Sequence, residues 1–392
     1  MKPFPDNSLP GKKIIFLVTE DWYFCSHRLP IARAVRDAGC EVVIATRVDA
    51  HGGTITSEGF RVIPLQMRRR SKNPARELAA VLEIINIYRR ERPDLVHHVA
   101  LKPVLYGALA ARFVGVPAVV NALAGLGYVF SSSQSRARIL RLFVRAAFRA
   151  LLNRQNSVVL LQNPDDRRML IESKTISPER TALIRGSGVD TVRFKLSPEP
   201  EDGPVLVTLV ARMLRDKGIL EFVEASRLLR QQGIHFRAVL VGTPDPDNPT
   251  SISVSQLEAW QAEGLVEWWG QKDNVPAVWA QSHISVLPSA YGEGVPMSLI
   301  EAAACGRPII TTDMPGCREI VQHEKNGLLI SIKDSKALAD AIYRLIENPD
   351  LRRQMGQEGR KLVEKEFAES IVVTQTLNLY QSMLGEQWPA AS

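Results

Sequence analysis

The stretch KIIFLV, residues 13–18, is a continuous apolar run after its lysine and has the length of one β-strand. A strand without polar alternation has both faces buried, which is typical of a parallel sheet covered by helices on both sides. The second half of the chain opens on a similar run, PVLVTLV at residues 204–210. The two runs predict two parallel sheets in a chain of 392 residues, a length that favours two domains over one core.

Strands and helices alternate around both runs. Further strands are predicted at 41–45, 60–64, 94–98, 118–121, 236–241, 266–270, 284–287 and 308–311, and helices at 28–38, 73–91, 103–114 and 219–231. Asn73 and Pro74 suit the N-cap and first position of their helix. Residues 190–204, rich in Pro, Glu and Asp, form the predicted linker. The fold class is therefore α/β, with two Rossmann-like, doubly wound domains facing an interdomain cleft.

Composition narrows the class of protein. Apolar residues make up 45% and charged residues 23% of the chain, as in soluble globular proteins. No apolar run approaches the roughly 20 residues of a membrane-spanning helix, and no signal peptide is recognised at the N-terminus. The four cysteines show no CxxC spacing, which favours a reducing cytoplasm over a disulfide or metal framework.

The net charge of +7 is unevenly distributed. One basic cluster spans residues 67–76. A second basic cluster spans residues 135–154. It carries Arg138, Arg141, Arg145 and Arg149 at spacings of three and four, which on a helix places them in one stripe. Such a helix suits an anionic membrane surface, although a solvated charged face over a packed core is the plainer alternative. Nucleic acid is not expected, because no binding motif or interleaved aromatic residues are present.

Two cations follow the strand at 204–210. Arg212 comes directly after it, and Lys217 precedes Gly218, which opens the next predicted helix. Cationic side chains beside the N–H groups of a helix N-terminus form an anion site suited to a diphosphate. Two exposed cations in a loop are the alternative. Gly242 ends the next strand and would let a ligand approach the backbone closely.

Two acids lie eight positions apart in SAYGEGVPMSLIEAAACG, residues 289–306. Glu293 stands between two glycines in a predicted turn, and Glu301 falls in an apolar helix whose first turn is expected to hold Pro296. A carboxylate in an apolar helix needs a donor partner or a ligand. The two hydroxyls of a ribose suit it, whereas a buried basic or amide partner is the alternative.

These residues carry a resemblance to a known family. The RxxxxKG element at Arg212–Gly218, the Glu293/Glu301 pair in EGVPMSLIEAAACGRPII and the following TTDMPGCREIV resemble the retaining glycosyltransferases of family 4, which have the GT-B fold. The resemblance spans the C-terminal half with consistent order and spacing. In the N-terminal half, TEDWYFCSHRLP, HHVALKPVLYGALAARFVGVPAVVNALAGLGYVF and LLQNPDD are similar to a branch of that family acting on lipid-linked sugars in polysaccharide or glycan assembly.

The resemblance implies a role for each matching residue. Arg212 and Lys217 would neutralise the nucleotide diphosphate and stabilise the leaving group, so they and Glu293 are the candidate catalytic residues. Glu301 would hold the ribose, and Glu293 would contact the donor sugar. The backbone of Gly294, Val295, Pro296 and Met297, with Gly242 nearby, would surround sugar and phosphate. No Asp-x-Asp pattern stands directly at a strand end, since Asp245-Pro-Asp247 lies further along the loop after the strand at 236–241. Neither a metal nor a cofactor is expected.

The chain also departs from the family pattern. Glu20 and the three residues after it stand where many members have a Gly-Gly loop, which makes Glu20 a candidate substrate contact. His97 matches the first histidine of a common His-x-His pattern, but Val99 replaces the second. His97 is therefore a candidate contact for the acceptor or sugar, with a structural role as the alternative. Because His98 is adjacent on the same strand, the two imidazoles are expected on opposite faces.

The resemblance also implies which domain binds which substrate. Residues 1–189 would bind the acceptor, with helix 369–392 packing back on them, and residues 190–368 would bind the nucleotide sugar. The expected reaction moves a hexose or N-acetylhexosamine, from UDP in the usual case, to a sugar on a lipid diphosphate. The enzyme would sit on the inner face of the cytoplasmic membrane, where the four stripe arginines would contact lipid.

Three alternatives remain from the sequence. One is another GT-B enzyme, such as a nucleotide-sugar epimerase, and a second is a non-catalytic nucleotide-sugar-binding protein. The third, an NAD-dependent Rossmann enzyme, lacks the GxGxxG motif after any strand.

Overall fold

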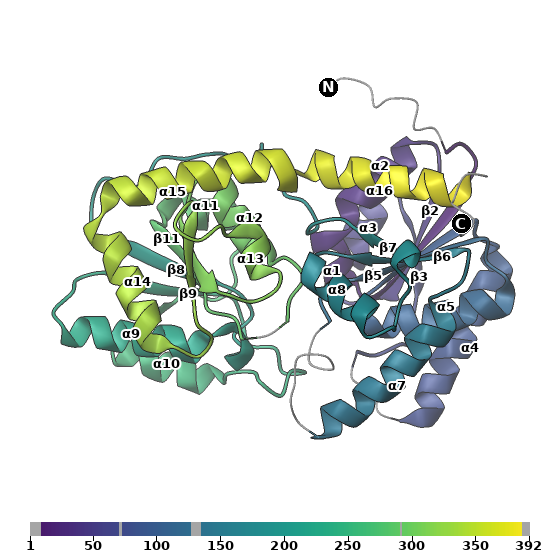
Figure 1. Cartoon of the computed structure of the whole chain (residues 1–392), viewed down its shortest axis with the longest axis horizontal. Helices are drawn as coiled ribbons and strands as arrows, with labels where there is room; N and C mark the ends of the chain where they lie inside the picture. The colour runs from purple at the N-terminus through teal and green to yellow at the C-terminus, as the bar shows by residue number, and fades with distance from the viewer. Residues whose placement is uncertain (1–8, 70–72, 127–134, 291, 386–392) are drawn as a thin grey trace. The chain divides into compact units, whose positions relative to one another are not determined.

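The computed structural model describes residues 9–69, 73–126, 135–290 and 292–385. The chain forms two compact units, residues 1–187 with 370–392 and residues 188–369 (Figure 1). The sequence placed the division between 189 and 190 and between 368 and 369.

The first unit is built on a seven-stranded sheet in the order β3-β2-β1-β4-β5-β6-β7, with every pairing parallel. Its strands are β1 Lys13–Glu20, β2 Glu41–Arg47, β3 Arg61–Pro64, β4 Leu95–Val99, β5 Ala118–Leu123, β6 Ser157–Leu161 and β7 Thr181–Leu183. Its helices are α1 Asp21–His27, α2 Leu29–Asp37, α3 Gly52–Ser57, α4 Pro74–Glu91, α5 Leu101–Val114, α7 Ser135–Leu151, α8 Pro164–Glu172, the 3₁₀ turn η1 Pro178–Arg180 and α16 Glu369–Leu384.

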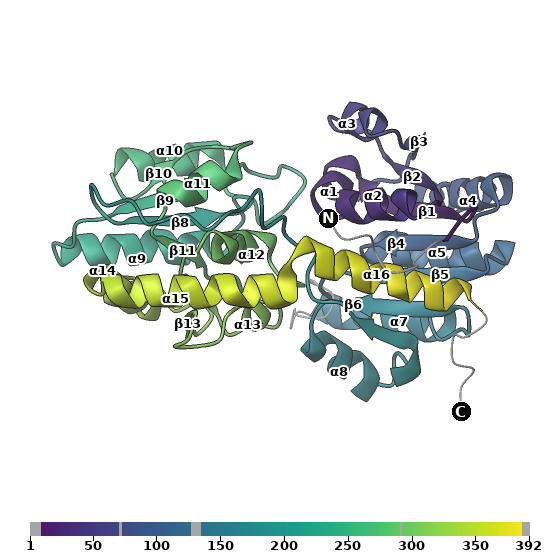
Figure 2. The same cartoon turned by 90° about the horizontal axis from the view of Figure 1, so that it is seen from above.

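The central strand β1 shows why both faces of this sheet are covered. Ile14, Phe16 and Val18 pack into a core with residues of α2 and α16, and the two alternate residues of the strand pack into a second core with residues of α4. Successive side chains of a strand point to opposite faces, so an unbroken apolar run fills both cores. Figure 2 shows α16 lying along the first unit, although it is the last helix of the chain.

The second unit repeats the arrangement in a six-stranded parallel sheet of order β10-β9-β8-β11-β12-β13. Its strands are β8 Leu206–Val210, β9 Arg237–Val241, β10 Glu267–Trp268, β11 Ile284–Leu287, β12 Ile309–Thr312 and β13 Gly327–Ile330. Its helices are α9 Ile219–Gln231, α10 Val254–Ala262, α11 Val275–Gln281, α12 Met297–Ala304, α13 Cys317–Ile320, α14 Ser335–Glu347 and α15 Pro349–Leu362, with the 3₁₀ turn η2 Arg215–Lys217 and the π-helical turn η3 Val363–Phe367.

Both sheets follow the Rossmann strand order, in which the first strand of the sheet along the chain lies beside the fourth. The chain therefore reverses direction across the sheet between β1 and β4, and again between β8 and β11. Ligands of open α/β sheets bind outside the carboxyl ends of the strands at this switch point. The predicted fold class, two Rossmann-like α/β domains, is confirmed.

The helix cap predicted from the sequence at Asn73 agrees with the structure. The side chain of Asn73 accepts hydrogen bonds from the N–H groups of Ala75 and Arg76, so it caps α4 as predicted. The helix predicted at 28–38 is confirmed as α2, Leu29–Asp37. A helix that was not predicted, α1, begins at Asp21 directly after β1, and Arg28 at φ −129° separates it from α2.

Two further observations concern the cysteines and the search for a membrane-spanning helix. Cys25, Cys40, Cys305 and Cys317 are all free thiols. Within the described ranges, no helix combines the length and apolarity needed to cross a bilayer.

Candidate active site

The switch point of the second unit brings together residues that follow β8 and β11. The segment after β8 crosses to η2 and then to α9, with Gly218 at φ +76° as the N-cap of that helix. A Cβ on Gly218 would lie 2.2 Å from the carbonyl oxygen of Pro288, so glycine is required for this close approach. The approach places Lys217 beside the segment after β11.

Lys217 and Glu293 form the centre of this site. The Nζ of Lys217 lies 2.6 Å from Oε2 of Glu293, and the Oγ of Ser289 donates a hydrogen bond of 2.7 Å to Oε1 of the same carboxylate. Both charged side chains are mostly buried, with 16% and 13% of their surface exposed. The structure thus joins two of the three predicted catalytic residues in one ion pair.

Arg212 has a different partner. Its Nη1 pairs with the carboxylate of Asp245, in the loop after β9, and the guanidinium remains partly exposed. That loop is tied to the segment after β8, since the N–H of Arg215 donates to the carbonyl of Thr250 and the hydroxyl of Thr250 donates to Asp216. Sequence reasoning missed Asp245 and Ser289, because neither falls within the motif spacing that singled out the other residues.

The turn that carries Glu293 is packed against the loop after β12. Gly316, at φ +72°, lies so close that a Cβ there would come within 1.4 Å of the carbonyl oxygen of Gly294. Helix α12 then begins at Met297, with Pro296 as its N-cap rather than in its first turn. The first N–H groups of a helix have no partner within the helix, so this start presents donors and a positive dipole end beside Glu293.

Glu301 lies one turn into α12 and is partly buried. Burial raises the pKa of its carboxyl to about 7, against smaller lowering effects from the indole N–H of Trp279 and the charge of Arg193. That indole has no other hydrogen-bond partner among the described residues. With a pKa near 7, this carboxyl is only partly ionised at neutral pH. Ligand hydroxyls that donate hydrogen bonds to its charged form would therefore stabilise that form.

Gly242 has a packing role. Its φ is +136°, and a Cβ would lie 1.9 Å from the carbonyl oxygen of Ala211. Its N–H donates to the carbonyl of Gly270, and its own carbonyl accepts from Nε1 of Trp268. The glycine therefore lets the segments after β8 and β9 pack closely, and both of its backbone polar groups bond within the protein.

His97 and His98 are interior residues of the first unit. His97 lies in the middle of β4, is 0% exposed, stacks on Phe16 and bonds through Nδ1 to the hydroxyl of Tyr380. His98 is equally buried, with Nε2 bonded to Tyr88 and Nδ1 to Asn121. The two imidazoles point to opposite faces, as expected. Burial lowers the pKa of both imidazoles, that of His98 to about 4, and a substrate contact of His97 would require opening this core.

Glu20 and Asp21 occupy the switch point of the first unit. Glu20 ends β1, and its carboxylate lies 3.5 Å from Nη1 of Arg47. Asp21 is fully buried and accepts hydrogen bonds from the N–H groups of Asp49 and His51. Where a Gly-Gly loop was expected from the resemblance, the chain thus has an acid that fixes the segment after β2.

The arginine stripe of α7 is only partly a free surface. The side chain of Arg138 lies outside the described residues, and Arg141 and Arg145 are half-buried. Arg149 donates to the carbonyls of Lys174 and Ser173. The helix is anchored by the buried side chains of Val144 and Phe148. Beside the stripe, Leu142 and Phe143 are 66% and 70% exposed.

The described residues contain no group of three or more His, Cys, Asp or Glu side chains placed to hold a metal ion.

Comparison with known proteins finds a glycosyltransferase family in each half of the chain. Residues 192–362 match the family described as glycosyl transferases group 1, and residues 13–163 match the glycosyl transferase 4-like family. The chain is 25% identical over 369 residues to the N,N'-diacetylbacillosaminyl-diphospho-undecaprenol alpha-1,3-N-acetylgalactosaminyltransferase of Campylobacter jejuni, covering 91% of this chain and 95% of that protein.

Two further matches bear on substrate and fold. The UDP-Gal:alpha-D-GlcNAc-diphosphoundecaprenol alpha-1,3-galactosyltransferase of Escherichia coli is 23% identical over 283 residues, covering 70% of this chain and 71% of that enzyme. Anabaena HepE, solved in complex with UDP, shares the fold with a TM-score of 0.75 at 20% identity, covering 94% of this chain and 100% of that one.

Proposed function

This chain is a glycosyltransferase, with residues 192–362 matching glycosyl transferases group 1 and residues 13–163 matching the glycosyl transferase 4-like family. From that premise we propose that it transfers a sugar from a UDP-sugar to a sugar held on a lipid diphosphate. The observation that carries the proposal is the Lys217–Glu293 pair at the switch point between β8 and β11. It combines a cation for a diphosphate with a carboxylate for sugar hydroxyls where such sheets bind ligands.

The donor site follows from these contacts. Lys217 and Arg212 take the two phosphates, and the start of α12 adds backbone N–H groups. Glu301 accepts from the ribose hydroxyls, and Glu293 accepts from the sugar. Without a donor, the two cations are neutralised by Glu293 and Asp245. Donor binding therefore exchanges one anion for another, and Glu293 is released from Lys217 as the phosphate arrives.

The chemical step breaks the bond between the anomeric carbon and the diphosphate oxygen, which keeps the electron pair. Charge then grows on that oxygen, where Lys217 and Arg212 stabilise it electrostatically. The acceptor hydroxyl attacks from the face that the diphosphate leaves, and its proton passes to the departing phosphate oxygen. This retaining course is the one implied by the resemblance to family 4. Because two cations are available for the diphosphate, EDTA is expected to leave turnover unchanged.

The lipid-linked acceptor is supported by the activities of the Campylobacter and Escherichia coli relatives, both of which are named for transfer to sugars linked to diphosphoundecaprenol. A polyprenyl tail stays in the bilayer, so the enzyme must work at a membrane surface. The proposed location is therefore the inner face of the cytoplasmic membrane, with the first unit holding the acceptor.

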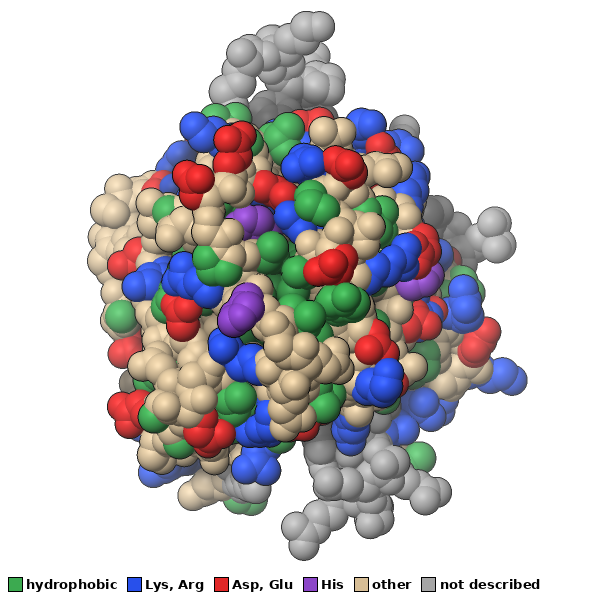
Figure 3. Space-filling model, turned by 90° about the vertical axis from the view of Figure 1, so that its left-hand side faces the viewer, with side chains coloured by type: hydrophobic (Ala, Val, Ile, Leu, Met, Phe, Trp, Pro, Cys, Tyr) green, Lys and Arg blue, Asp and Glu red, His purple; other side chains and the backbone are tan. Residues whose placement is uncertain are grey.

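Helix α7 is the proposed membrane contact. Residues 135–151 contain five arginines and no acid, whereas acidic and basic side chains are interspersed on the face of the second unit shown in Figure 3. Exposed Leu142 and Phe143 lie beside the stripe, and Leu109 and Phe113 are exposed on neighbouring α5. Apolar side chains with adjacent cations suit the interface of an anionic bilayer.

Flotation with anionic liposomes tests this contact. Replacing Arg138, Arg141, Arg145 and Arg149 by Gln should release the protein from the vesicles, and replacing Leu142 and Phe143 by Ala should weaken binding at high salt. Unchanged flotation in both variants would remove α7 from the proposal.

The proposed activity is tested by product analysis. The protein is incubated with a panel of UDP-sugars and a lipid-diphosphate-sugar acceptor, and the lipid fraction is analysed by mass spectrometry. One UDP-sugar should add a single sugar to the acceptor with release of UDP. Release of a free sugar or an epimer without lipid product would favour the epimerase alternative, and no transfer from any nucleotide sugar would refute the proposal.

A further inference from the structure

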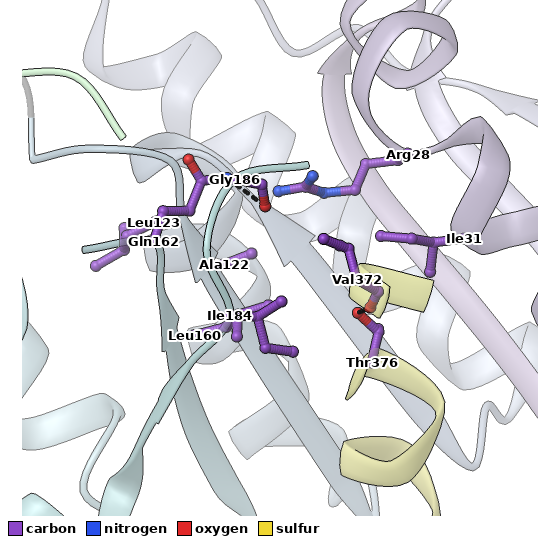
Figure 4. A pocket seen from close by; sticks show the side chains of 10 residues that line it. All are labelled: Arg28, Ile31, Ala122, Leu123, Leu160, Gln162, Ile184, Gly186, Val372 and Thr376. Atoms are coloured by element: carbon purple, nitrogen blue, oxygen red, sulfur yellow. Dashed lines mark hydrogen bonds between the residues drawn. The ribbon is translucent and has the colours of Figure 1, made fainter. Parts of the chain in front are cut away.

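A small cavity in the first unit has a buried arginine in its wall. It is lined by Arg28, Ile31, Ala122, Leu123, Leu160, Gln162, Ile184, Gly186, Val372 and Thr376. Leu123 ends β5 and Gln162 follows β6, so the cavity lies at the carboxyl edge of the sheet. Figure 4 shows the Arg28 guanidinium extending toward Gly186 and Gln162, with the side chains of Ala122, Leu160 and Ile184 below them in the view.

The charge of Arg28 has no acidic partner in the described part of the chain. Its side chain is 3% exposed, and Nη1 donates to the carbonyl of His27 at 2.9 Å and to the hydroxyl of Ser187 at 3.0 Å. Its Nε has no hydrogen-bond partner there. In the second unit, the buried guanidinium of Arg352 lies 3.2 Å from the carboxylate of Glu199, whereas the fully buried Arg307 donates, among the described residues, only to neutral oxygens of Ser197 and Pro198. Arg28 also lacks an acidic partner, but its side chain lines a cavity.

An unpaired buried charge is costly, because the guanidinium loses its hydration without gaining a counter-ion. Desolvation accordingly lowers the pKa of Arg28. An apolar residue of similar volume would avoid this cost. Since the sequence retains a cation at the edge of the sheet where ligands bind, an anion from outside the protein is the missing partner.

We propose that Arg28 binds a phosphate oxygen of the lipid-diphosphate acceptor. This inference rests on the proposed function for the identity of the ligand. The cavity volume of about 10 Å³ accommodates one water-sized group, so one oxygen enters while the rest of the phosphate remains at the mouth. The neutral amide of Gln162 and the hydroxyl of Thr376 complete the polar lining. Arg28 thereby recognises the acceptor independently of the donor residues in the second unit.

The experiment compares Arg28→Met with Arg28→Lys, which keeps the charge. Arg180→Met is the matched control, because Arg180 is the other buried arginine among the described residues of the first unit and bonds to the carbonyl of Gln155. For each variant, Tm is measured with inorganic phosphate, with methylene diphosphonate, and with NaCl at equal ionic strength. Acceptor KM and the Kd for UDP are measured in parallel.

Arg28→Met should have an unchanged or higher Tm without anions, because it removes an uncompensated buried charge. It should lose the rise in Tm that phosphate gives the wild type, and its acceptor KM should increase about tenfold or more, the size of one charge-assisted hydrogen bond. The Kd for UDP should stay unchanged. Arg28→Lys should keep part of the phosphate effect, and Arg180→Met all of it.

Several outcomes would overturn the inference. A lower Tm in Arg28→Met with unchanged acceptor KM would assign Arg28 a purely structural role in holding Ser187. An equal Tm rise with NaCl, or a full phosphate effect retained in Arg28→Met, would exclude a phosphate site there. A phosphate effect that depends on Arg28 while acceptor KM does not would make free phosphate the ligand. If the wild type transfers no sugar, the proposed function fails, yet the phosphate series still tests the Arg28 site.

Discussion

The cations at the two proposed sites are held in different ways. In the second unit, Lys217 and Arg212 are paired with the carboxylates of Glu293 and Asp245, whereas Arg28 in the first unit is buried among neutral groups. A paired cation costs little in the empty protein and exchanges its partner when a phosphate binds. An unpaired one is costly until its ligand arrives. If Arg28 binds the acceptor as proposed, the donor site is charge-balanced when empty, while the acceptor site gains its counter-ion only on binding.

The largest effect is expected from Lys217→Ala. If Lys217 stabilises the leaving diphosphate, the substitution should lower kcat by about 10²–10³-fold, the usual cost of losing one electrostatic contact to the transition state. Steady-state kinetics with a UDP-sugar measures it. Lys336→Ala is the control, because Lys336 forms an exposed pair with Asp340 in the same unit. A kcat within threefold of wild type would show that the Lys217–Glu293 pair only stabilises the fold.

The next effect concerns the ribose. Glu301→Ala should weaken UDP binding about ten- to a hundredfold, because hydrogen bonds to a charged group contribute about 1.5–3 kcal/mol each. The loss should appear with UDP alone, without the sugar. Isothermal titration measures it, and equal UDP affinity in mutant and wild type would remove Glu301 from the nucleotide site.

A pH dependence follows from the same carboxyl. Its pKa in the folded protein is about 7, against an ordinary value of 4.5, and ribose hydroxyls donate to its charged form. UDP affinity should therefore fall as pH drops below about 7, by at most about tenfold per pH unit. Glu301→Gln should remove this slope but keep the part due to titration of UDP itself. Identical slopes in the two proteins would contradict the assignment.

Stability should change in the opposite sense. Because the folded state holds this proton more tightly than the unfolded chain, the free energy of unfolding should fall as pH rises from about 4.5 to about 7. Glu301→Gln should lack this contribution, as measured by urea unfolding at several pH values. A wild type and variant with parallel stability profiles would mean that the carboxyl is not protonated in the folded protein.

The smallest effect is expected from Asp245→Asn. Removing the carboxylate that competes for Arg212 should strengthen UDP binding about two- to fivefold, since a partly exposed ion pair contributes about 1 kcal/mol or less. Asp247→Asn, on the same loop but exposed, is the control. Weaker UDP binding in Asp245→Asn would mean that Asp245 positions Arg212 rather than competing with the phosphate.

The sequence predicted the parts of this molecule that depend on local pattern. Continuous apolar runs located the central strands, and β11 and α9 have the predicted bounds. The family resemblance assigned Lys217 and Glu293 to one ligand, and the structure joins them in an ion pair.

The remaining features depend on contacts between distant residues. His97 belongs to the core because Tyr380 comes from a helix 283 residues later, which no local pattern reveals. Spacing placed four arginines in one stripe on α7, but Arg149 is held by carbonyls after α8. Arg28 lies in a motif used only for the family resemblance, and its missing partner becomes visible only once the cavity is known.

The account depends most on Glu293, which is assigned to the sugar and not to the nucleotide. The direct test is Glu293→Ala, with UDP affinity measured by titration and transfer measured in a single turnover with the UDP-sugar that the wild type uses. The account predicts UDP affinity within a few-fold of wild type and no detectable transfer. Retained turnover, or loss of UDP binding equal to that of Glu301→Ala, would contradict it.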